Sequence, residues 1–392
     1  MKKTVLFSLL LMPLLVMSQS YKKLHQRSIV IDTHNDFPTQ AADKGVRFDQ
    51  NLKGRTHSDL QRMKEGGMDI QVFSIFCDGG FGKGAAYKRA NQEIDSVYAW
   101  LERNPSAMML VKTPSDLQRA VKEKKLGTMM GVEGGHMIED DLQKLDQLFE
   151  RGVRYMTLTW NNSTAWATSA ADEVKDTLPM EKRGLTAFGK QIVQRMNELG
   201  MIVDVSHVGE RTFWDAIATT TKPVIASHSC VHAICPVSRN LKDDQLKAIA
   251  KNNGVVHLNF YSGFLDSGFN ARNNAFLQAH KVERDSLRKI NPEPYYASQV
   301  LFEKYPDEVK SLRPPLSLLL DHLDYIVKLI GVDHVGLGSD FDGISSSPQQ
   351  LDDVTGLPLL TKALLERGYK KKDIRKILGG NFIRVFKANM KS

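Results

Sequence analysis

A histidine and an aspartate stand two residues apart directly after the first short apolar run of the chain. The run Ser28–Thr33 reads SIVIDT and leads through His34 and Asn35 to Asp36. Side chains two residues apart in an extended segment point to the same side, so His34 and Asp36 can reach one ion. Imidazole and carboxylate are both ligands for zinc and similar divalent metals. Taken alone, such a pair is more typical of a polar strand end.

A carboxylate also follows a later apolar run, Thr128–Val132. Glu133 precedes Gly134 and Gly135, and a turn without side chains leaves room for a ligand to approach closely. The two oxygens of one glutamate can also bridge two cations. A glutamate before a glycine turn is common, however, so Glu133 by itself is weak evidence for a metal.

Three further runs end in residues that could do chemistry. His207 comes shortly after Ile202–Val205, and His228 comes directly after Pro223–Ser227. One histidine at such a place is often structural, but two on consecutive strands would lie side by side. Asp340 follows the last run at the same level, within the sequence GSDFDG.

Eight short apolar runs recur along the chain and alternate with stretches of helical periodicity. Strands that alternate with helices indicate a parallel sheet, and eight such units favour an α/β protein with a closed (β/α)8 TIM barrel. The alternative, an open doubly wound sheet, lacks the glycine fingerprint of a dinucleotide-binding unit after the first strand. The predicted strands are Ser28–Thr33, Ile70–Phe76, Thr128–Val132, Tyr155–Thr159, Ile202–Val205, Pro223–Ser227, Val255–Asn259 and His334–Gly338. The predicted helices include Asp141–Arg151, Thr186–Leu199, Gly209–Ala218 and Asp243–Lys251.

The candidate residues share one place in this barrel, the carboxyl ends of the strands. Active sites of (β/α)8 barrels form at that face, from side chains at the ends of several strands. Each candidate could have a purely structural role by itself, but the occurrence of six of them at five strand ends indicates a metal site. The sequence therefore predicts a metal centre at the barrel mouth, with His34, Asp36, Glu133, His207 and His228 as candidate ligands and the Asp340 carboxylate at the same level.

The connection between the seventh and eighth predicted strands is unusually long. It runs from Phe260 to Gly331 and contains five prolines. Structureless loops of that length are rare in compact domains. We therefore expect an enlarged insertion with extra helices that cover the barrel mouth or make an interface.

Six motifs occur in an order that resembles the renal (membrane) dipeptidase family of zinc metallopeptidases. They are HND, EGG, SH, SHS, SRN and GSDFDG, and the resemblance extends over residues 29–386. It implies a barrel of the metal-dependent hydrolase type that holds two zinc ions per subunit. The implied ligands are His34 and Asp36 for one ion, His207 and His228 for the other, and Glu133 as the bridge.

The resemblance also implies a reaction, the hydrolysis of dipeptides by a hydroxide that the two ions share. Glu133, as the bridging ligand, and Asp340 are the implied catalytic residues, with Asp340 carrying a proton to the leaving amine. Arg239, in the SRN motif, would bind the substrate carboxylate through its bidentate fork, which favours dipeptides over longer chains. The alternatives are a structural acid at Asp340, with Asp342 easily confused with it, and a surface arginine at a helix start.

One departure from the family concerns the substrate. The fourth strand of the dipeptidases ends in Leu-Thr-His, whereas this chain has Leu158, Thr159 and Trp160. Losing one donor to a tetrahedral intermediate can cost ~2.7–4 kcal/mol. Trp160, Asn161 and Tyr261 are therefore expected to contact the substrate. A shifted substrate range is one alternative function, and an impaired metal-containing protein that binds carboxylates or peptides is another.

The N-terminus has the pattern of a secretory signal peptide. Lys2 and Lys3 precede the apolar run Val5–Met17, and Ser18–Ser20 follow it. The run is shorter than the ~20 residues that span a bilayer, and no other run approaches that length. The sequence thus predicts a signal peptide at residues 1–20 and a single barrel domain at residues 21–392. It predicts a periplasmic or secreted protein with no transmembrane anchor after cleavage.

The formal charge of +8 does not indicate nucleic acid. Two of the excess positive charges lie in the signal, and most others are spread out or in a C-terminal cluster, without RNP-like or zinc-finger spacing. Three cysteines, Cys77, Cys230 and Cys235, are too few for a disulfide scaffold and leave at least one unpaired. The expected partners are therefore small dipeptides, together with a second copy, because the resemblance implies a homodimer.

Overall fold

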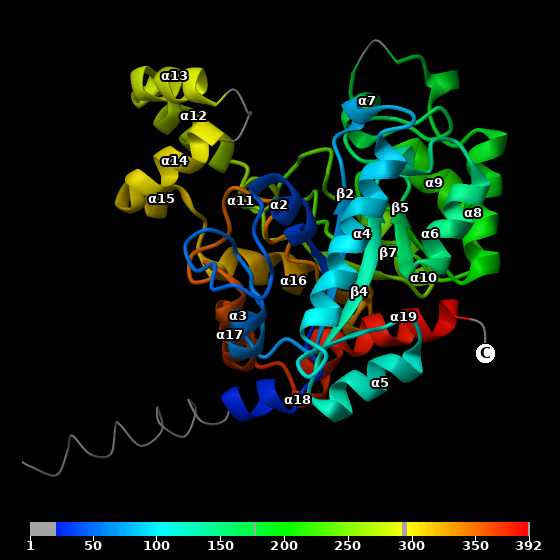
Figure 1. Cartoon of the computed structure of the whole chain (residues 1–392), viewed down its shortest axis with the longest axis horizontal. Coiled ribbons are helices and arrows are strands. Elements are labelled where there is room, and N and C mark those ends of the chain that lie inside the picture. The colour runs from blue at the N-terminus through cyan, green and yellow to red at the C-terminus, as the bar shows by residue number, and fades with distance from the viewer. Residues whose placement is uncertain (1–20, 176–177, 292–295, 391–392) are drawn as a thin grey trace, which may run out of the picture.

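Eight parallel strands form a barrel at the centre of the structure (Figure 1). The computed structural model describes residues 21–175, 178–291 and 296–390, so the predicted signal peptide, residues 1–20, lies outside the described residues. The strand order is β1-β2-β4-β5-β6-β7-β8-β9. The strands are β1 (Ile31–Asn35), β2 (Ile70–Phe76), β3 (Met108–Leu110), β4 (Leu126–Glu133), β5 (Val153–Thr157), β6 (Ile202–Asp204), β7 (Ile225–Ala226), β8 (Val255–Leu258) and β9 (Val335–Leu337).

The barrel closes between β9 and β1. Asn35 and Phe341 form a parallel bridge. The Asp340 N–H donates to His34 O at 3.1 Å, and the Asp36 N–H donates to Phe341 O at 2.9 Å. These bonds join the first strand to the last, which confirms the predicted (β/α)8 barrel.

The ninth strand, β3, was not predicted. Its residues Met108–Leu110 pair in parallel with Leu126–Thr128 at the start of β4. β2 pairs with the opposite edge of β4, and β5 begins its pairing with β4 only at Met130. β3 therefore fills the part of the edge that β5 leaves free. Three apolar residues are too short a run to give a strand signal in the sequence.

The helices surround the barrel, and the local sequence explains their limits. In α8, Thr186 accepts a hydrogen bond from the Gly189 N–H at the start, and Gly200 ends the helix with φ 87°. The four predicted helices are confirmed as α6, α8, α9 and α10. The helices are α2 (Phe37–Lys44), α3 (Leu60–Glu65), α4 (Ala86–Arg103), α5 (Pro114–Glu123), α6 (Leu142–Glu150), α7 (Ala170–Glu173), α8 (Ala187–Leu199), α9 (Glu210–Thr219), α10 (Asp243–Lys251), α11 (Ser262–Leu265), α12 (Phe269–Ala279), α13 (Lys281–Ile290), α14 (Tyr296–Lys304), α15 (Pro306–Leu312), α16 (Leu316–Ile330), α17 (Leu357–Glu366), α18 (Lys371–Arg375) and α19 (Asn381–Asn389).

Side chains fill the barrel interior, and α19 closes its lower end. Ile31, Ile70 and Ile202 from three strands pack with Phe382 and Phe386 of α19 in one buried cluster. Figure 1 shows α19 across the end of the barrel beside α5. The opposite end, where the strands finish, carries the predicted site residues.

The insertion between β8 and β9 does contain extra helices, as predicted. Helices α12 to α15 project from one side of the barrel (Figure 1). They have a small apolar cluster of their own, formed by Phe269, Phe276, Leu301 and Leu312. The last helix of the insertion, α16, packs against α10, β8 and β9, so it is the helix that precedes β9 in the barrel.

Candidate functional site

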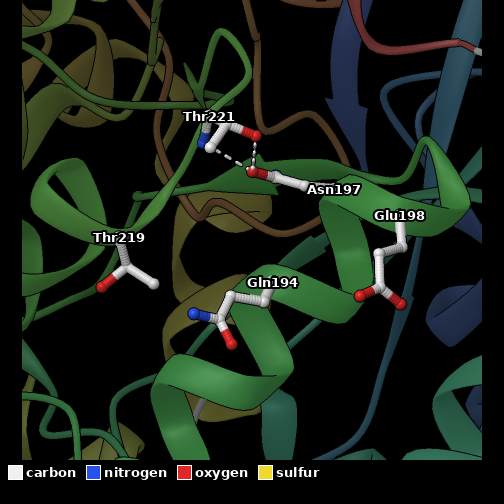
Figure 2. Close-up of a pocket in the computed structure, with 5 residues that line it drawn as sticks. All are labelled: Gln194, Asn197, Glu198, Thr219 and Thr221. Carbon is white, nitrogen blue, oxygen red and sulfur yellow. Dashed lines mark hydrogen bonds between the residues drawn. The ribbon is translucent and has the colours of Figure 1, made fainter.

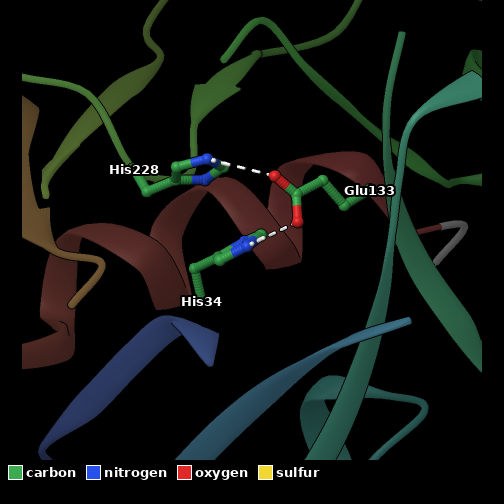
Figure 3. Close-up of side chains that lie close together, drawn as sticks. All are labelled: His34, Glu133 and His228. Carbon is green, nitrogen blue, oxygen red and sulfur yellow. Dashed lines mark hydrogen bonds and ion pairs between the residues drawn. The ribbon is translucent and has the colours of Figure 1, made fainter. Parts of the chain in front are cut away.

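The side chains predicted to bind metal come together at the carboxyl end of the barrel. His34 belongs to β1, Glu133 is the last residue of β4, and His228 follows β7. A shift of register in β1 between Asp32 and Asn35 re-aims the strand end that carries His34. Figure 3 shows the Glu133 carboxylate between the rings of His34 and His228.

Glu133 contacts all three predicted histidines. Its Oε2 lies 3.1 Å from His34 Nε2, and its Oε1 lies 2.9 Å from His207 Nε2 and 3.5 Å from His228 Nε2. His207 Nε2 and His228 Nε2 are 2.9 Å apart. Asp36 Oδ2 lies 3.6 Å from His34 Nε2. All five predicted ligands thus form one buried cluster.

The other nitrogen of each imidazole is held by a hydrogen bond. The Tyr155 hydroxyl donates to Thr33 O, so its oxygen accepts from His34 Nδ1 at 2.8 Å. The Asn161 amide oxygen accepts from His207 Nδ1 at 3.1 Å. These bonds place the hydrogen on Nδ1 and leave Nε2 with a lone pair.

His228 is held in the same manner by Ser227. The Ser227 hydroxyl donates to Asp204 Oδ2 at 2.6 Å, so its oxygen accepts from His228 Nδ1 at 2.8 Å. Three Nε2 lone pairs therefore converge on the oxygens of Glu133, an arrangement that is repulsive unless a positive charge lies among them. Asp36 Oδ1 is also buried without a hydrogen-bond partner. This donor set fits a site for divalent metal ions.

The electrostatics of the cluster agree with that interpretation. Burial lowers the pKa of His207 to about 4, and the charge of Arg239 acts in the same direction. Burial also holds the pKa of His228 well below its usual range, with a further contribution from His34. Both imidazoles are thus in the neutral form that binds metal.

The surroundings of His34 and Glu133 favour positive charge in the cluster. Burial works to lower the pKa of His34, but Tyr155, Glu133 and Asp36 outweigh it and raise that pKa. Burial works to raise the pKa of Glu133, but the close contacts with His34, His207 and His228 hold that pKa well below its usual range. The protein therefore favours a cation beside a glutamate that stays ionised.

Asp340 lies beside the cluster, within reach of His34 and Asp36. Its Oδ2 accepts a hydrogen bond from Asn259 Nδ2 at 2.8 Å. Burial, reinforced by the Asp36 and Glu133 carboxylates, raises the pKa of Asp340 well above its usual range. Asn259 was not predicted, although its place at the end of the predicted strand Val255–Asn259 was a usable signal.

Asp342 has a separate structural task. The His57 N–H donates to its Oδ1 at 2.6 Å, and the Ser58 hydroxyl donates to its Oδ2 at 2.5 Å. Its two oxygens therefore tie the segment before α3 to the end of β9. Of the two aspartates in the GSDFDG motif, Asp340 is the one beside the metal ligands.

Arg239 lies next to the cluster with unused hydrogen-bonding capacity. Its Nη2 donates to His228 O at 3.4 Å, and its guanidinium stands over the Phe264 ring at 5.3 Å. Its Nε is buried without a hydrogen-bond partner, and no carboxylate of the described residues lies within ion-pair distance. Burial lowers the pKa of Arg239 to about 10, so it stays charged at neutral pH. A cation of this kind, with a buried Nε–H and no ion-pair partner among the described residues, suits a carboxylate ligand.

The remaining predicted contacts occupy different places. The Trp160 ring lies 4.9 Å from the Phe76 ring and 6.4 Å from the His207 ring, beside the cluster. Asn161 contacts His207, as described above. Tyr261 packs against the rings of Phe264 and Phe269, at the base of the insertion.

The cysteines are buried and free. Cys230 donates to Asn259 O at 3.2 Å, and Cys77 lies 3.6 Å from His136 Nε2. Burial raises the pKa of Cys77 to about 12 and that of Cys235 to about 11. Thiols that stay protonated are poor nucleophiles and poor metal ligands. They add nothing to the chemistry of the site.

A surface hollow of about 320 Å³ lies elsewhere, at the ends of α8 and α9 (Figure 2). Asn197 Oδ1 accepts hydrogen bonds there from the Thr221 N–H at 2.7 Å and the Thr221 hydroxyl at 3.1 Å. α8 ends just before β6 begins, so this hollow is at the end of the barrel opposite the metal ligands. In the described part of the chain, no helix is both long and apolar enough to cross a membrane.

Comparison with known proteins identifies the family. The model of the membrane dipeptidase family, peptidase family M19, matches residues 18–392. The dipeptidase AC, an M19 metallopeptidase, is 27% identical with a TM-score of 0.75 over 92% of this chain and 98% of its own. A metallopeptidase from Rhodobacter sphaeroides, solved with a phosphinate mimic of the dipeptide L-Ala-D-Ala, is 26% identical with a TM-score of 0.73 over 93% and 100%.

A third structure shares the fold. The probable dipeptidase PvdM from Pseudomonas aeruginosa is 24% identical, with a TM-score of 0.75 over 95% of this chain and 98% of its own. The family match covers the barrel and every predicted site residue. The chain belongs to the membrane dipeptidase family and is a metallopeptidase of that family, a hydrolase.

Proposed function

We propose that the chain hydrolyses dipeptides with two zinc ions at the barrel mouth. His34 and Asp36 would hold one ion, and His207 and His228 the other. Glu133 would bridge them, since its two oxygens already face the two groups separately. The observation that carries the proposal is the convergence of three imidazole Nε2 atoms on one buried carboxylate.

When bound, the two ions would supply an activated water and polarise the substrate carbonyl. The chain's own residues bind the dipeptide and move the proton. Arg239 binds the substrate carboxylate through its Nε–H, which no described residue accepts, together with an Nη group. A free carboxylate one residue past the scissile bond is a feature of dipeptides, so this contact selects them.

Asp340 accepts and returns the proton. The Asn259 amide fixes its Oδ2 at 2.8 Å, which leaves Oδ1 to carry the proton to the leaving amine. A carboxyl group whose pKa is raised by burial is suited to donate a proton near neutral pH. Asp340 is partly buried beside Asp36, close enough to the ligands to act on a group bound between them.

The proposal is tested by metal analysis and hydrolysis together. Purified protein, reconstituted with Zn²⁺, should hold two ions per chain and cleave members of a dipeptide panel that includes L-D pairs. Glu133→Gln should lose both bound metal and activity. Trace metal only after reconstitution would exclude the binuclear site, and no turnover across the panel would exclude the dipeptidase activity.

A second candidate is a substrate range shifted by Trp160. Its ring lies beside the cluster and packs on Phe76, where the family resemblance implies a histidine. An indole can donate one hydrogen bond but cannot accept a proton. We expect Trp160→His to raise kcat on simple dipeptides if the indole limits turnover, and to lower it if the indole contributes to substrate binding.

Export and assembly remain proposals about the whole protein. We propose that residues 1–20 are removed and that the remainder acts outside the cytoplasm as a homodimer. N-terminal sequencing of the protein from the producing cells would show the cleavage site. Light scattering after size-exclusion chromatography would give the mass in solution, and a monomer would exclude the dimer.

A further inference from the structure

The three metal-facing imidazoles are oriented by different side chains. His34 is held by the Tyr155 hydroxyl, and His207 by the Asn161 amide oxygen. His228 is held by the Ser227 hydroxyl. Each contact lies on the ring nitrogen that points away from the cluster, and each fixes which nitrogen carries the hydrogen. The supports on the two sides of Glu133 share no residue.

The support of His228 continues to a buried carboxylate. Asp204 Oδ2 accepts from the Ser227 hydroxyl at 2.6 Å and from the Thr157 hydroxyl at 2.5 Å. Asp204 Oδ1 accepts from the Ser227 N–H at 2.8 Å. Ser227 thus links the Asp204 carboxylate to the imidazole through two hydrogen bonds, and this chain makes His228 Nε2 a more basic ligand.

The support of His34 is different in kind. The Tyr155 hydroxyl uses its hydrogen on the backbone oxygen of Thr33 at 3.1 Å. Among the described residues, no carboxylate takes part in the hydrogen bonds of this phenol, so His34 is oriented by a hydroxyl group that is not linked to a buried acid. The two groups of ligands therefore have separate and unequal supports.

We propose that Ser227 and Asn161 are positioning residues for the ion held by His207 and His228, and that Tyr155 is the positioning residue for the ion held by His34 and Asp36. This inference rests on the proposed function, which assigns the ligands to two ions. It adds that the affinity of the protein for one ion can be changed without changing its affinity for the other. Loss of one such support typically weakens metal binding by ~10–100-fold.

The experiment measures Zn²⁺ affinity directly, by competition with a chromogenic chelator, and follows Co²⁺ binding by its visible absorption. Ser227→Ala should weaken the binding of the ion held by His207 and His228 by ~10–100-fold and leave the other ion bound with wild-type affinity. Tyr155→Phe should instead weaken the binding of the ion held by His34 and Asp36. The matched control is Thr157→Val, which removes a hydrogen bond to the same oxygen of Asp204 but contacts no imidazole.

Asn161 allows a rescue test, because the residue lies at the surface. Asn161→Leu should weaken the same ion as Ser227→Ala, and Asn161→Asp, which keeps an acceptor oxygen, should restore its affinity. Affinities unchanged in Ser227→Ala, or changed equally in Thr157→Val, would overturn the inference while wild-type protein still binds two ions. Wild-type protein that binds no metal would overturn the proposed function and this inference together.

Discussion

Removal of the Arg239 guanidinium should abolish the preference of the enzyme for substrates with a free carboxylate. Arg239 has a buried Nε–H without a partner, and its Nη2 makes one long hydrogen bond, of 3.4 Å, to His228 O. A substrate carboxylate can therefore accept two charge-assisted hydrogen bonds from Nε and an Nη. At ~1.5–3 kcal/mol each, these bonds contribute ~3–6 kcal/mol. Loss of both should lower kcat/KM by ~10²–10⁴-fold.

The assay compares a dipeptide with its C-terminal amide. Wild-type protein should prefer the free acid by a large factor, whereas Arg239→Ala should treat the two substrates almost alike. Arg239→Lys keeps the charge but not the bidentate geometry, so its preference for the free acid should lie between those of the wild type and Arg239→Ala. Arg195 of α8 pairs with Asp146 of α6 and with Glu198 of its own helix, and it offers a control substitution to Ala on the surface.

Two results would refute this reasoning. If Arg239→Ala lowers kcat/KM equally for the acid and the amide, the guanidinium supports the loop after β7 and does not bind the substrate. If the KM for the dipeptide is unchanged, the substrate carboxylate binds elsewhere. Metal content should stay that of the wild type, because Arg239 contacts His228 only through its backbone oxygen.

Three further predictions concern the proton, pH and the core. Asp340→Asn keeps an acceptor for Asn259 but cannot carry a proton. We therefore expect kcat to fall by ~10²–10⁴-fold while the zinc content stays unchanged. An unaltered kcat would show that another group transfers the proton. Burial raises the pKa of Asp69 from 3.8 to about 6. The contribution of Asp69 to the free energy of unfolding is therefore complete below pH 4, and it declines by up to ~3 kcal/mol as the pH rises to 6. Asp69→Asn should remove that decline, and urea unfolding at pH 4 and 7 measures the difference from wild type. Phe382→Ala should cost ~3–5 kcal/mol in the same unfolding assay, because the ring is buried at the closed end of the barrel, and a loss below 1 kcal/mol would contradict its role in closing that end.

The sequence predicted the barrel because its signal is local. A run such as Ile70–Phe76 is mostly apolar, as expected for a strand that is buried on both faces, and it is β2 without change of limits. A polar residue after such a run must lie at the barrel mouth, so Glu133 and His228 could be placed from the chain alone. β3 gave no such signal, because its three residues pair only with the start of β4.

The supports of the imidazoles could not be predicted, because they join residues that are far apart in the chain. Tyr155 and His34 are separated by 121 positions, and nothing near Tyr155 indicates a polar role. Asn161 was expected to contact the substrate, and the structure places its amide oxygen on His207. Such contacts depend on the register between strands, and strands that are buried on both faces lack the alternation that would indicate their register.

Two site residues have a backbone conformation that only a fixed framework maintains. His207 has φ 62° and Asp340 has φ 61°, in the left-handed region that non-glycine residues seldom adopt. In each case a buried aspartate holds the preceding residue. Asp204 accepts from the Ser206 N–H at 3.0 Å, and Asp32 accepts from the Ser339 N–H at 2.7 Å.

These two aspartates explain why the strain persists at the barrel mouth. An unusual φ costs ~1–3 kcal/mol, and a hydrogen bond to a charged group contributes ~1.5–3 kcal/mol. Asp32 also accepts from the Ser339 hydroxyl, and Asp204 from the Thr157 hydroxyl, so each has more than one bond to offset the strain. Both join neighbouring strands, so the contacts that hold the barrel together also aim His207 at Glu133 and Asp340 at the space beside it. A metal centre at this position therefore depends on two acids that contact no ion.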